Sequence, residues 1–456
     1  MIEKGTIRQV LLDQREESEV LLKRCGVTRE CEKALAQGLS DTLIKVITGV
    51  RRCGKSVLAH RVLRGQPYGY VNFDDERLFS LSTADLNIVL EVLIEITPNM
   101  KFVLLDEIQN IEGWELFANR LQRQGYVVML TGSNAHLLSR ELATHLTGRH
   151  RVHEVYPYSF PEYLRARGHE LPSGNAFSTR ECAAISALFA DYFAAGGFPE
   201  VGQVVNPRAY LQDLYDRTLT RDIAMRHGVR HIRTLKDIAF YVANNCGGKL
   251  TYQNIAAAYS LGSLHTAKNY LSYLQDAYLF FAVEAFAFKV KERTRRPRKM
   301  YGIDPALIRA TAGGTDNRGL LLENVVFLEL LRRRKIVHYY ADPHGKHEID
   351  FVSRDPETNA VELIQVCADL SRAETREREL RGLQHAATAF GNLPDENLML
   401  LTMDHRGVEP IADRRISCLP VWEWLLPSPP RGAVGLRRKS AHRSGRPAPA
   451  PPGTVT

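Results

Sequence analysis

The chain has no Cys-x-x-Cys pair, no internal repeat and no apolar run long enough to span a bilayer. Its seven cysteines lie far apart, so we interpret them as reduced thiols in a cytosolic protein. Residues 1–30 are charged and lack an apolar segment, so we expect no secretory signal there. These absences predict a cytoplasmic protein that does not associate with a membrane.

The composition is that of an ordinary globular protein, with 44% hydrophobic and 25% charged residues. A length of 456 residues is enough for roughly three domains, each with its own core. The net charge of +8 and the pI near 9.0 fit nucleic acid or another polyanion as a partner. Such an excess matters only where the basic residues are concentrated.

The pattern along the chain predicts an α/β protein with several segments. Short apolar runs alternate with helical stretches in the first third, which is typical of a doubly wound parallel sheet; they lie at residues 44–48, 70–73, 102–105 and 127–131. The boundaries we expect are an N-terminal helical segment (1–41), a P-loop ATPase domain (42–165), a helical lid with a winged helix (166–302), a smaller α/β domain (303–425) and a disordered basic tail (426–456).

Residues 49–56 match the phosphate-binding P-loop pattern in full, between an apolar strand and a helix. Its glycines let backbone N–H groups surround phosphates at a helix N-terminus. Lys55 is expected to contact the β- and γ-phosphates, and the hydroxyl of Ser56 to bind Mg²⁺. The sequence therefore predicts a binding site for ATP and Mg²⁺, and the residues expected to form it are Gly49, Val50, Arg51, Arg52, Cys53, Gly54, Lys55, Ser56 and Val57.

Two acidic residues follow the apolar run at 102–105. The carboxyl end of such a strand is where ligands bind in open parallel sheets. Asp106 is then expected to hold Mg²⁺, through water, and Glu107 to act as the base on the attacking water. The alternative is a strand followed by an acidic helix cap.

Further polar residues suit the reacting phosphate. Asn134 or Ser133, after the next strand, could sense the γ-phosphate, although helix capping explains them as well. Arg140 and Arg149 could supply positive charge to the transition state, in cis or from a neighbouring subunit of a homo-oligomer. A solvated surface position is the alternative for each arginine.

Four sequence stretches resemble a widespread prokaryotic family of AAA-type ATP-binding proteins. They are residues 47–52, residues 105–109 (Leu-Asp-Glu-Ile-Gln), residues 130–133 (Leu-Thr-Gly-Ser) and residues 196–200 (Gly-Gly-Phe-Pro-Glu). The resemblance covers nearly the whole chain except the tail. It implies an ATPase coupled to a C-terminal domain of unknown function, and it names no pathway.

The middle of the chain has helix-turn-helix spacing. A short helix at 251–259 is followed by a turn and by a second helix at 264–277, which Ser263 can cap. Strands near 279–286 and 300–303 then flank a basic loop, so we expect a winged helix. Such a module binds DNA through its second helix and its wing, or serves as a protein-interaction lid. The residues expected to contact DNA are His265, Lys268, Asn269, Arg293, Arg295, Arg296 and Arg298.

The C-terminal α/β segment resembles the restriction-endonuclease-like fold. Glu323 on a helix and Asp350 on a strand would be metal ligands, with Glu362 nearby. However, Gln365 stands where an acid would be and Cys367 where a lysine would be, and glutamine is a poor Mg²⁺ ligand. We therefore expect no cleavage by the usual metal route. The histidines of this segment (His338, His344 and His347) do not complete a set of zinc ligands and are expected at the surface.

Together these features favour an ATP-driven switch that controls binding of nucleic acid or a protein partner. One alternative is an ATP-dependent nuclease that acts in defence or DNA processing. The other is a regulator or scaffold that uses ATP binding only to set its assembly.

Overall fold

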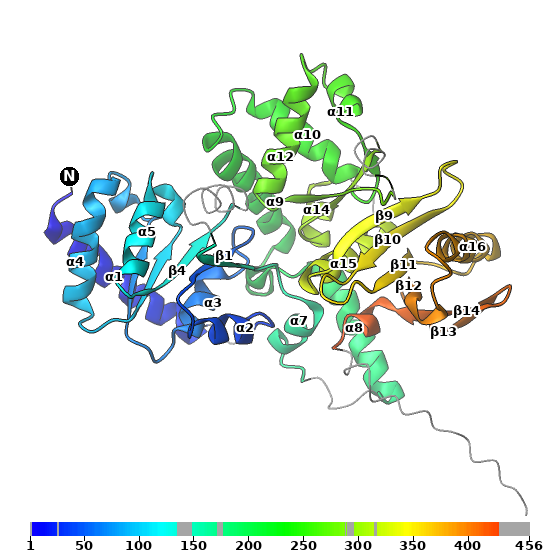
Figure 1. The fold of residues 1–456 in the computed structure, drawn as a ribbon, viewed down its shortest axis with the longest axis horizontal. Helices are drawn as coiled ribbons and strands as arrows, with labels where there is room; N and C mark the ends of the chain where they lie inside the picture. Colours follow the sequence, from blue (N-terminus) through cyan, green and yellow to red (C-terminus); the bar gives the residue numbers. More distant parts are fainter. Residues whose placement is uncertain are drawn as a thin grey trace, which may run out of the picture.

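A computed structural model describes residues 2–24, 27–134, 148–170, 177–287, 289, 296–313 and 317–427. Arg140, Arg293, Arg295 and most of the expected tail lie outside these residues. The N-terminal and C-terminal sheets lie at opposite ends of the molecule, and helical segments lie between them (Figure 1). Within the described residues, no helix has both the length and the hydropathy needed to cross a membrane.

The N-terminal domain is built on a parallel five-stranded sheet of order β2-β3-β4-β1-β5. The strands are β1 (Ile44–Thr48), β2 (Tyr68–Asn72), β3 (Phe102–Asp106), β4 (Val127–Gly132) and β5 (His150–Glu154). The main helices are α3 (Lys55–Val62), α4 (Leu86–Ile96) and α5 (Trp114–Arg123). Every residue of β1 is buried, as expected for an inner strand of a covered parallel sheet. Because β4 lies between β1 and β3, the carboxyl ends of these three strands are adjacent.

The N-terminal segment lies against this sheet. Helix α1 (Lys4–Arg24) buries Ile7, Val10 and Leu11 in the core that α4 and the strands share. The side chain of Gln14 exchanges two hydrogen bonds with the backbone of Asn72 in β2, at 3.0 and 2.9 Å. A short helix, α2 (Glu32–Gly38), leads into β1. The helical segment expected at residues 1–41 thus packs on the ATPase domain.

The middle region is mainly helical. It contains α7 (Phe160–Ala166), α8 (Thr179–Ala195), α9 (Pro207–Arg217), the π-helix η5 (Thr218–Met225), α10 (Ile232–Asn244), α11 (Tyr252–Ala258), α12 (Leu264–Asp276) and α14 (Pro305–Thr311). Three short strands, β6 (Lys249–Leu250), β7 (Phe280–Val283) and β8 (Arg298–Gly302), form an antiparallel sheet of order β6-β8-β7. As expected, Ser263 caps α12, because its hydroxyl accepts a hydrogen bond from the N–H of Thr266 at 3.2 Å.

The C-terminal domain is a six-stranded mixed sheet of order β13-β14-β12-β11-β10-β9. Its elements are α15 (Arg318–Arg332), β9 (Ile336–Ala341), β10 (Glu348–Arg354), β11 (Val361–Cys367), α16 (Ala373–Ala389), β12 (Leu398–Thr402), β13 (Gly407–Ile411), β14 (Arg414–Pro420) and α17 (Val421–Trp424). Residues of α15 share a core with Phe351 and Ile364, whereas α16 packs with Val352 and Leu363. Since neighbouring residues of a strand face opposite ways, the two helices cover opposite faces.

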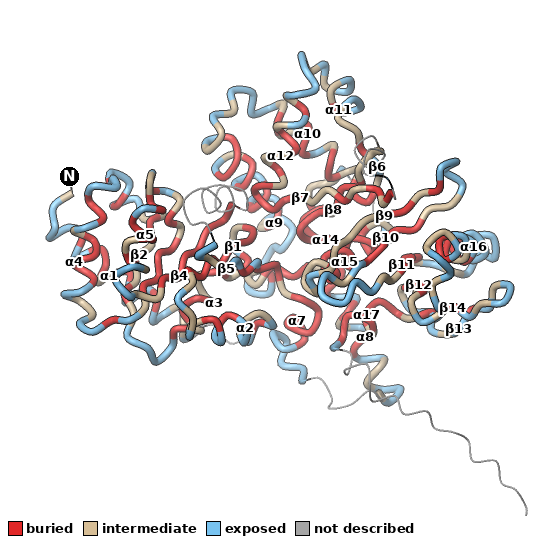
Figure 2. The backbone as a smooth tube through the Cα atoms, viewed as in Figure 1, coloured by how far each residue is buried: buried red, intermediate tan, exposed pale blue. Residues whose placement is uncertain are grey.

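One hydrophobic cluster contains residues of all three regions, from Leu35 to Leu426. Buried segments accordingly run through both large sheets and the helices between them, while exposed segments lie on the outer turns (Figure 2). The N-terminal sheet and the C-terminal sheet are therefore joined through packed side chains.

Candidate functional sites

The P-loop backbone requires glycine at two positions. Gly49 has φ of 150° and Gly54, at the N-cap of α3, has φ of 95°. A Cβ at Gly49 would collide with the carbonyl oxygen of Val155. Both glycines thus hold the chain in a path that other residues rarely adopt, with α3 starting directly after the loop.

Lys55 and Ser56 lie at the start of α3, beside the strand ends. The ammonium of Lys55 donates to the backbone carbonyls of Gly49 and Val50, at 3.1 Å each. It also lies 3.9 Å from a carboxylate oxygen of Glu107. The hydroxyl of Ser56 donates to Oδ1 of Asp106 at 3.1 Å. The loop, the start of α3 and the end of β3 therefore meet at one edge, as the sequence predicts.

Asp106 is buried at the end of β3 among hydroxyl groups. Thr131 donates to its Oδ1, and Tyr70 donates to its Oδ2 at 3.4 Å. Burial and the neighbouring charge of Glu107 raise the pKa of Asp106 to about 6. A carboxylate in such a place is stabilised by a cation, which is the role the sequence predicts for it.

Glu107 has a left-handed backbone conformation, with φ of 51°. Its N–H donates to the hydroxyl of Thr131 at 3.2 Å, which fixes the turn after β3. Its Oε2 accepts from the amide of Gln109 and, at 3.4 Å, from the hydroxyl of Ser133. Of the two polar residues that follow β4, Ser133 contacts Glu107 and Asn134 is buried next to it, and sensing of a γ-phosphate by either residue stays a prediction.

Arg149 lies at the other edge of the sheet. Its carbonyl accepts from the N–H of Ile44, the first residue of β1, whereas the P-loop follows the last residue of that strand. A five-residue strand separates the two edges by about 16 Å. The expected supply of positive charge by Arg149 in cis is therefore wrong; supply to a neighbouring subunit stays a prediction.

The π-helix η5 brings charged residues to the P-loop that sequence reasoning missed. Arg51 is 3.3 Å from Asp222 of η5 and 3.3 Å from Asp74 after β2. Burial raises the pKa of Asp222, against the effects of Arg51 and Arg226. Within the described chain, Nη1 of Arg226 is buried without a hydrogen-bond partner. No pattern in the sequence signals a π-helix, although such helices are frequent at functional sites.

A tyrosine of the middle region reaches the strand that leads into the P-loop. The hydroxyls of Tyr278, after α12, and Thr48, the last residue of β1, are 3.2 Å apart. Tyr278 also donates to Glu154 at the end of β5, at 3.2 Å. Its φ of 59° shows that the backbone is held in an unfavourable conformation to place this side chain.

The Gly-Gly-Phe-Pro-Glu stretch packs against the same loop. Glu200 forms an ion pair with Arg52 of the P-loop at 2.5 Å. A Cβ at Gly196 would collide with Asp304, and one at Gly197 would lie 2.5 Å from the carbonyl of Tyr158. The two glycines therefore permit close packing, and the glutamate contacts the nucleotide-binding loop.

A second cluster of carboxylates lies in the C-terminal domain, and a lysine occupies its centre. Lys299 of β8 is 3.0 Å from each of three carboxylates, those of Glu323, Glu348 and Asp350. The side chains of Lys299, Glu323 and Asp350 are 5%, 7% and 9% exposed. Tyr301 also donates to Glu323. Burial lowers the pKa of Lys299, but the three carboxylates outweigh it and hold that pKa well above its usual range.

Gln365 contacts Asp350, whereas Cys367 bonds elsewhere. The amide oxygen of Gln365 accepts from the N–H of Asp350 at 3.2 Å, and its nitrogen donates to Glu379 of α16 at 2.7 Å. The thiol of Cys367 points to the carbonyl of Asp369 at 3.2 Å. Gln365 thus connects α16 to β10, a role that needs an amide rather than a carboxylate.

The residues expected to contact DNA differ in their surroundings. Lys268 is exposed on α12. Arg296 donates to the carbonyl of Ala341 at 2.7 Å, and Arg298 is bonded to the hydroxyl of Tyr252 and, at 2.9 Å, to Glu284. Two of the four wing arginines therefore already have partners within the chain.

Comparisons with known proteins fit this arrangement. A family model described as an AAA domain matches residues 41–164, which carry the P-loop, Asp106, Glu107 and Ser133. An uncharacterized protein of Methanocaldococcus jannaschii is 31% identical over 444 residues, covering 93% of this chain and 96% of the relative. The chain belongs to the same family as this relative. An uncharacterized protein of Haemophilus influenzae is 32% identical over 340 residues, covering 70% of this chain and 82% of its own length.

The family thus combines an AAA-type ATPase domain with further regions. A model described as a domain of unknown function (DUF8612) matches residues 186–318, so it covers the helical middle region and ends near the start of α15. Among solved structures, a Walker-type ATPase of Pyrococcus abyssi is 17% identical with a TM-score of 0.39, covering 63% of this chain and 96% of that chain. The Aeropyrum pernix Orc1 protein in complex with DNA is 16% identical with a TM-score of 0.30, covering 70% and 98%. Similarities this low do not bear on function.

Proposed function

We propose that this protein is a Mg²⁺-dependent ATPase that acts as a switch, in which the nucleotide at the P-loop controls binding of a partner by the middle region. The observation that carries the proposal is the direct contact of P-loop residues with that region. Thr48, directly before the loop, meets Tyr278, and Arg51 of the loop meets Asp222, so a movement of the loop would change its contacts with the helices.

The residues at the strand ends fit ATP and Mg²⁺. Glycine at position 49 lets the loop pass close to the carbonyl of Val155, and the Ser56 hydroxyl already lies beside Asp106. The chemistry that Mg²⁺ supplies is neutralisation of charge on the phosphates. Lys55 would exchange its bonds to the loop carbonyls for phosphate oxygens, which carry a full negative charge and are better partners.

Glu107 is the proposed base. It would accept the proton of the attacking water, and the amide of Gln109 and the hydroxyl of Ser133 would orient it. The ammonium of Lys55, 3.9 Å away, attracts the same carboxylate toward the loop. These contacts support a positioned carboxylate rather than a helix cap.

Two contacts would transmit a change in the bound nucleotide to the middle region. Arg226 of the segment after η5 has an unpartnered buried nitrogen near Asp222, among the described residues, and a phosphate oxygen would satisfy it. Tyr278 connects β1 to the end of α12. A shift of either group would move the helix that we propose to contact the partner.

DNA is the partner that the middle region supports best. The element order α10-β6-α11-α12-β7-β8, with β8 paired to both other strands, supports the proposal of a winged helix. The first turn of α12 is exposed, with Leu264 49% exposed and Lys268 close by. Lys268, together with Arg293 and Arg295, would then contact phosphates, whereas Arg296 and Arg298 support the wing from within the chain.

The alternative of an ATP-dependent nuclease has less support. Lys299 already neutralises Glu323 and Asp350, and Gln365 is bonded to Glu379. We propose that the C-terminal α/β domain serves as a rigid support for the middle region. The scaffold alternative would be favoured if the protein failed to bind DNA at every salt concentration tested.

The test is the ATPase rate of the full chain with and without double-stranded DNA. We expect stimulation by DNA in the wild type and loss of that stimulation, but not of basal turnover, in Tyr278→Phe, because the hydroxyl contacts with Thr48 and Glu154 at the ends of β1 and β5 are removed. Tyr259→Phe is a matched control, since its hydroxyl bonds to Asp237 on the outside of α10. Equal stimulation in all three proteins would contradict the coupling, and no turnover in any would contradict the ATPase.

A further inference from the structure

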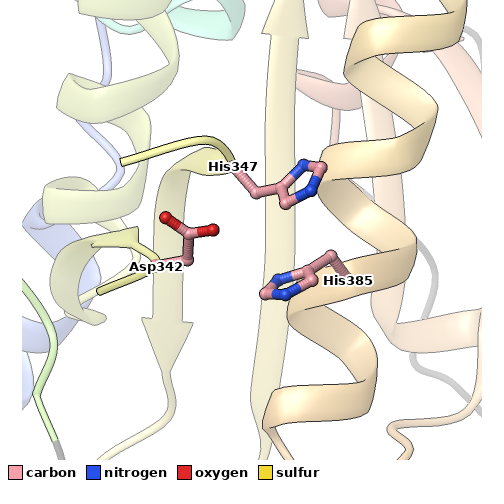
Figure 3. Close-up of side chains that lie close together, drawn as sticks. All are labelled: Asp342, His347 and His385. Carbon is pink, nitrogen blue, oxygen red and sulfur yellow. The ribbon is translucent and has the colours of Figure 1, made fainter. Parts of the chain in front are cut away.

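Three potential metal ligands meet at the end of the C-terminal sheet, and none of them belongs to the two sites described above. Asp342 follows β9, His347 precedes β10, and His385 lies on α16. One ligand atom of each lies within 4.8 Å of the others. Figure 3 shows the two imidazole rings face to face, with the Asp342 carboxylate beside them. The sequence alone does not bring these residues together, because His385 lies on a separate helix, far along the chain from His347.

The hairpin between β9 and β10 holds two of the three ligands in place. The N–H of Asp342 donates to the carbonyl of His347 at 2.9 Å, which closes the hairpin. One carboxylate oxygen of Asp342 accepts from the N–H of Lys346 at 2.8 Å, which fixes the side chain. Asp342 is buried, so its conformation is restricted before any ion binds. Such restriction lowers the entropy that metal binding would cost.

The third ligand approaches from the helix that covers this face of the sheet. The rings of His347 and His385 stack at 4.5 Å between centroids, with 22° between their planes. A tetrahedral zinc site has ligand atoms about 3.4 Å apart, given metal–nitrogen distances of about 2.0–2.1 Å. Metal binding would therefore require the ligand atoms to approach one another, which rotation about the side-chain torsions of the exposed His385 would provide.

The chemistry of the three ligands selects the class of ion. Two imidazoles and one carboxylate suit Zn²⁺, Co²⁺ or Ni²⁺, whereas Mg²⁺ prefers oxygen ligands alone. With three protein ligands, a fourth position remains for water or another donor. A shallow surface pocket of about 520 Å³ includes His347 and His385 and is also lined by Arg381, Gln384 and Thr388. Arg381 would favour an anionic group at the fourth position.

We propose that Asp342, His347 and His385 bind one divalent transition-metal ion of the zinc class, which ties α16 to the β9–β10 hairpin. The site is independent of the nucleotide site, because it shares no residue with it and excludes Mg²⁺. It also differs from the expectation that these histidines are only surface residues, because His385 and Asp342 supply the ligands that the histidine-rich segment itself lacks.

The test is titration of the metal-free, tag-free full chain with Zn²⁺ by calorimetry, in the presence of Mg²⁺. We expect one ion more per wild-type chain than per His385→Ala chain, and a Kd at least about 100-fold weaker in the variant, since even indirect partners of a metal site are worth 10–100-fold. His344→Ala is the matched control, because His344 is exposed in the same hairpin but lies outside the cluster. It should bind like the wild type.

A second readout separates binding from folding. Zn²⁺ should raise the melting temperature of the wild type and of His344→Ala by more than that of His385→Ala or His347→Ala, while all four melt alike in chelator. A different group, His405, Glu409 and Cys418, could bind zinc as well, and such binding would persist equally in every variant. Identical stoichiometry and Kd in wild type and His385→Ala would overturn the proposal.

Discussion

The chain contains two clusters of buried carboxylates with a lysine close by, and the two differ in what the lysine contacts. In the ATPase domain, Lys55 bonds to backbone carbonyls and stays 3.9 Å from Glu107. In the C-terminal domain, Lys299 lies 3.0 Å from each of three carboxylates. Asp106 is met by neutral hydroxyls, whereas Asp350 is met by a cation.

This difference separates a site that can accept a cation from one that already contains one. Neutral hydroxyls solvate a carboxylate but leave its charge in place, so Mg²⁺ can still bind. An ammonium at 3.0 Å compensates part of the carboxylate charge and occupies the space between the carboxylates, so a second cation would have to displace it. Acidic residues at strand ends therefore do not by themselves identify a metal site.

The largest effect is expected in the ATPase cluster. Lys55→Ala should abolish nucleotide binding, because no other described ammonium lies in the loop. Glu107→Gln should still bind ATP but turn over at least about 10²-fold more slowly, the usual contribution of a positioned base. Steady-state hydrolysis and nucleotide binding measure the two effects. Glu112→Gln, an exposed acid of the same turn, is the control, and wild-type turnover in Glu107→Gln would show that another group is the base.

The next effect concerns Lys299. Lys299→Met should lower the free energy of unfolding by about 3–5 kcal/mol, because it leaves buried carboxylates without their counter-charge. Denaturant unfolding measures the change, which should be largely reversed when Glu323→Gln and Asp350→Asn are added. Lys249→Met removes a half-exposed partner of Glu348 and should cost less than about 1 kcal/mol. Equal destabilisation in the two lysine variants would mean that Lys299 does not stabilise the buried carboxylates more than Lys249 stabilises Glu348.

A smaller effect is expected at the wing. Replacing Arg293 and Arg295 with Ala should reduce the slope of log K against log salt by about one for every phosphate that the protein no longer neutralises. Replacing Arg296 and Arg298 should change that slope less, because both are bonded within the chain. Fluorescence anisotropy with labelled duplex DNA over a salt series provides the measurement. No change in affinity or slope for either pair would show that the wing does not touch DNA.

The smallest expected effect is none at all. Supercoiled and linear DNA should stay intact with the purified protein in Mg²⁺ or Mn²⁺, with or without ATP, because Lys299 occupies the centre of the cluster and Gln365 replaces a carboxylate. Gel electrophoresis measures cleavage. Cleavage that disappears in Asp350→Ala would contradict this prediction and show that the C-terminal cluster is a working metal site.

The strands and the residues that follow them were predictable because their signals are local. An apolar run before a glycine-rich loop, or before two acids, determines both the strand and the edge at which its polar residues lie. Ser56, Asp106 and Ser133 could therefore be assigned to one edge. Arg149 could not be placed this way, because its position at the start of β5 depends on which end of the strand faces the P-loop.

Contacts between regions could not be predicted. Asp222 meets Arg51 across 171 positions, and Tyr278 meets Thr48 across 230. No spacing rule covers such pairs, since they depend on how the middle helices pack on the sheet. Lys299 shows the same limit: its sequence neighbours are basic, so it was expected in the loop of a wing, yet it points into the C-terminal domain.

By itself, the sequence determined the AAA-type P-loop, the order of the strands along the chain and the substitutions at Gln365 and Cys367, because each depends on residues close together in the chain. Only the tertiary structure decided which cation neutralises which carboxylate, and which histidines meet Asp342. Those outcomes depend on the distance between side chains from separate elements, and electrostatic and metal-ligand interactions act only over a few ångströms in the folded protein.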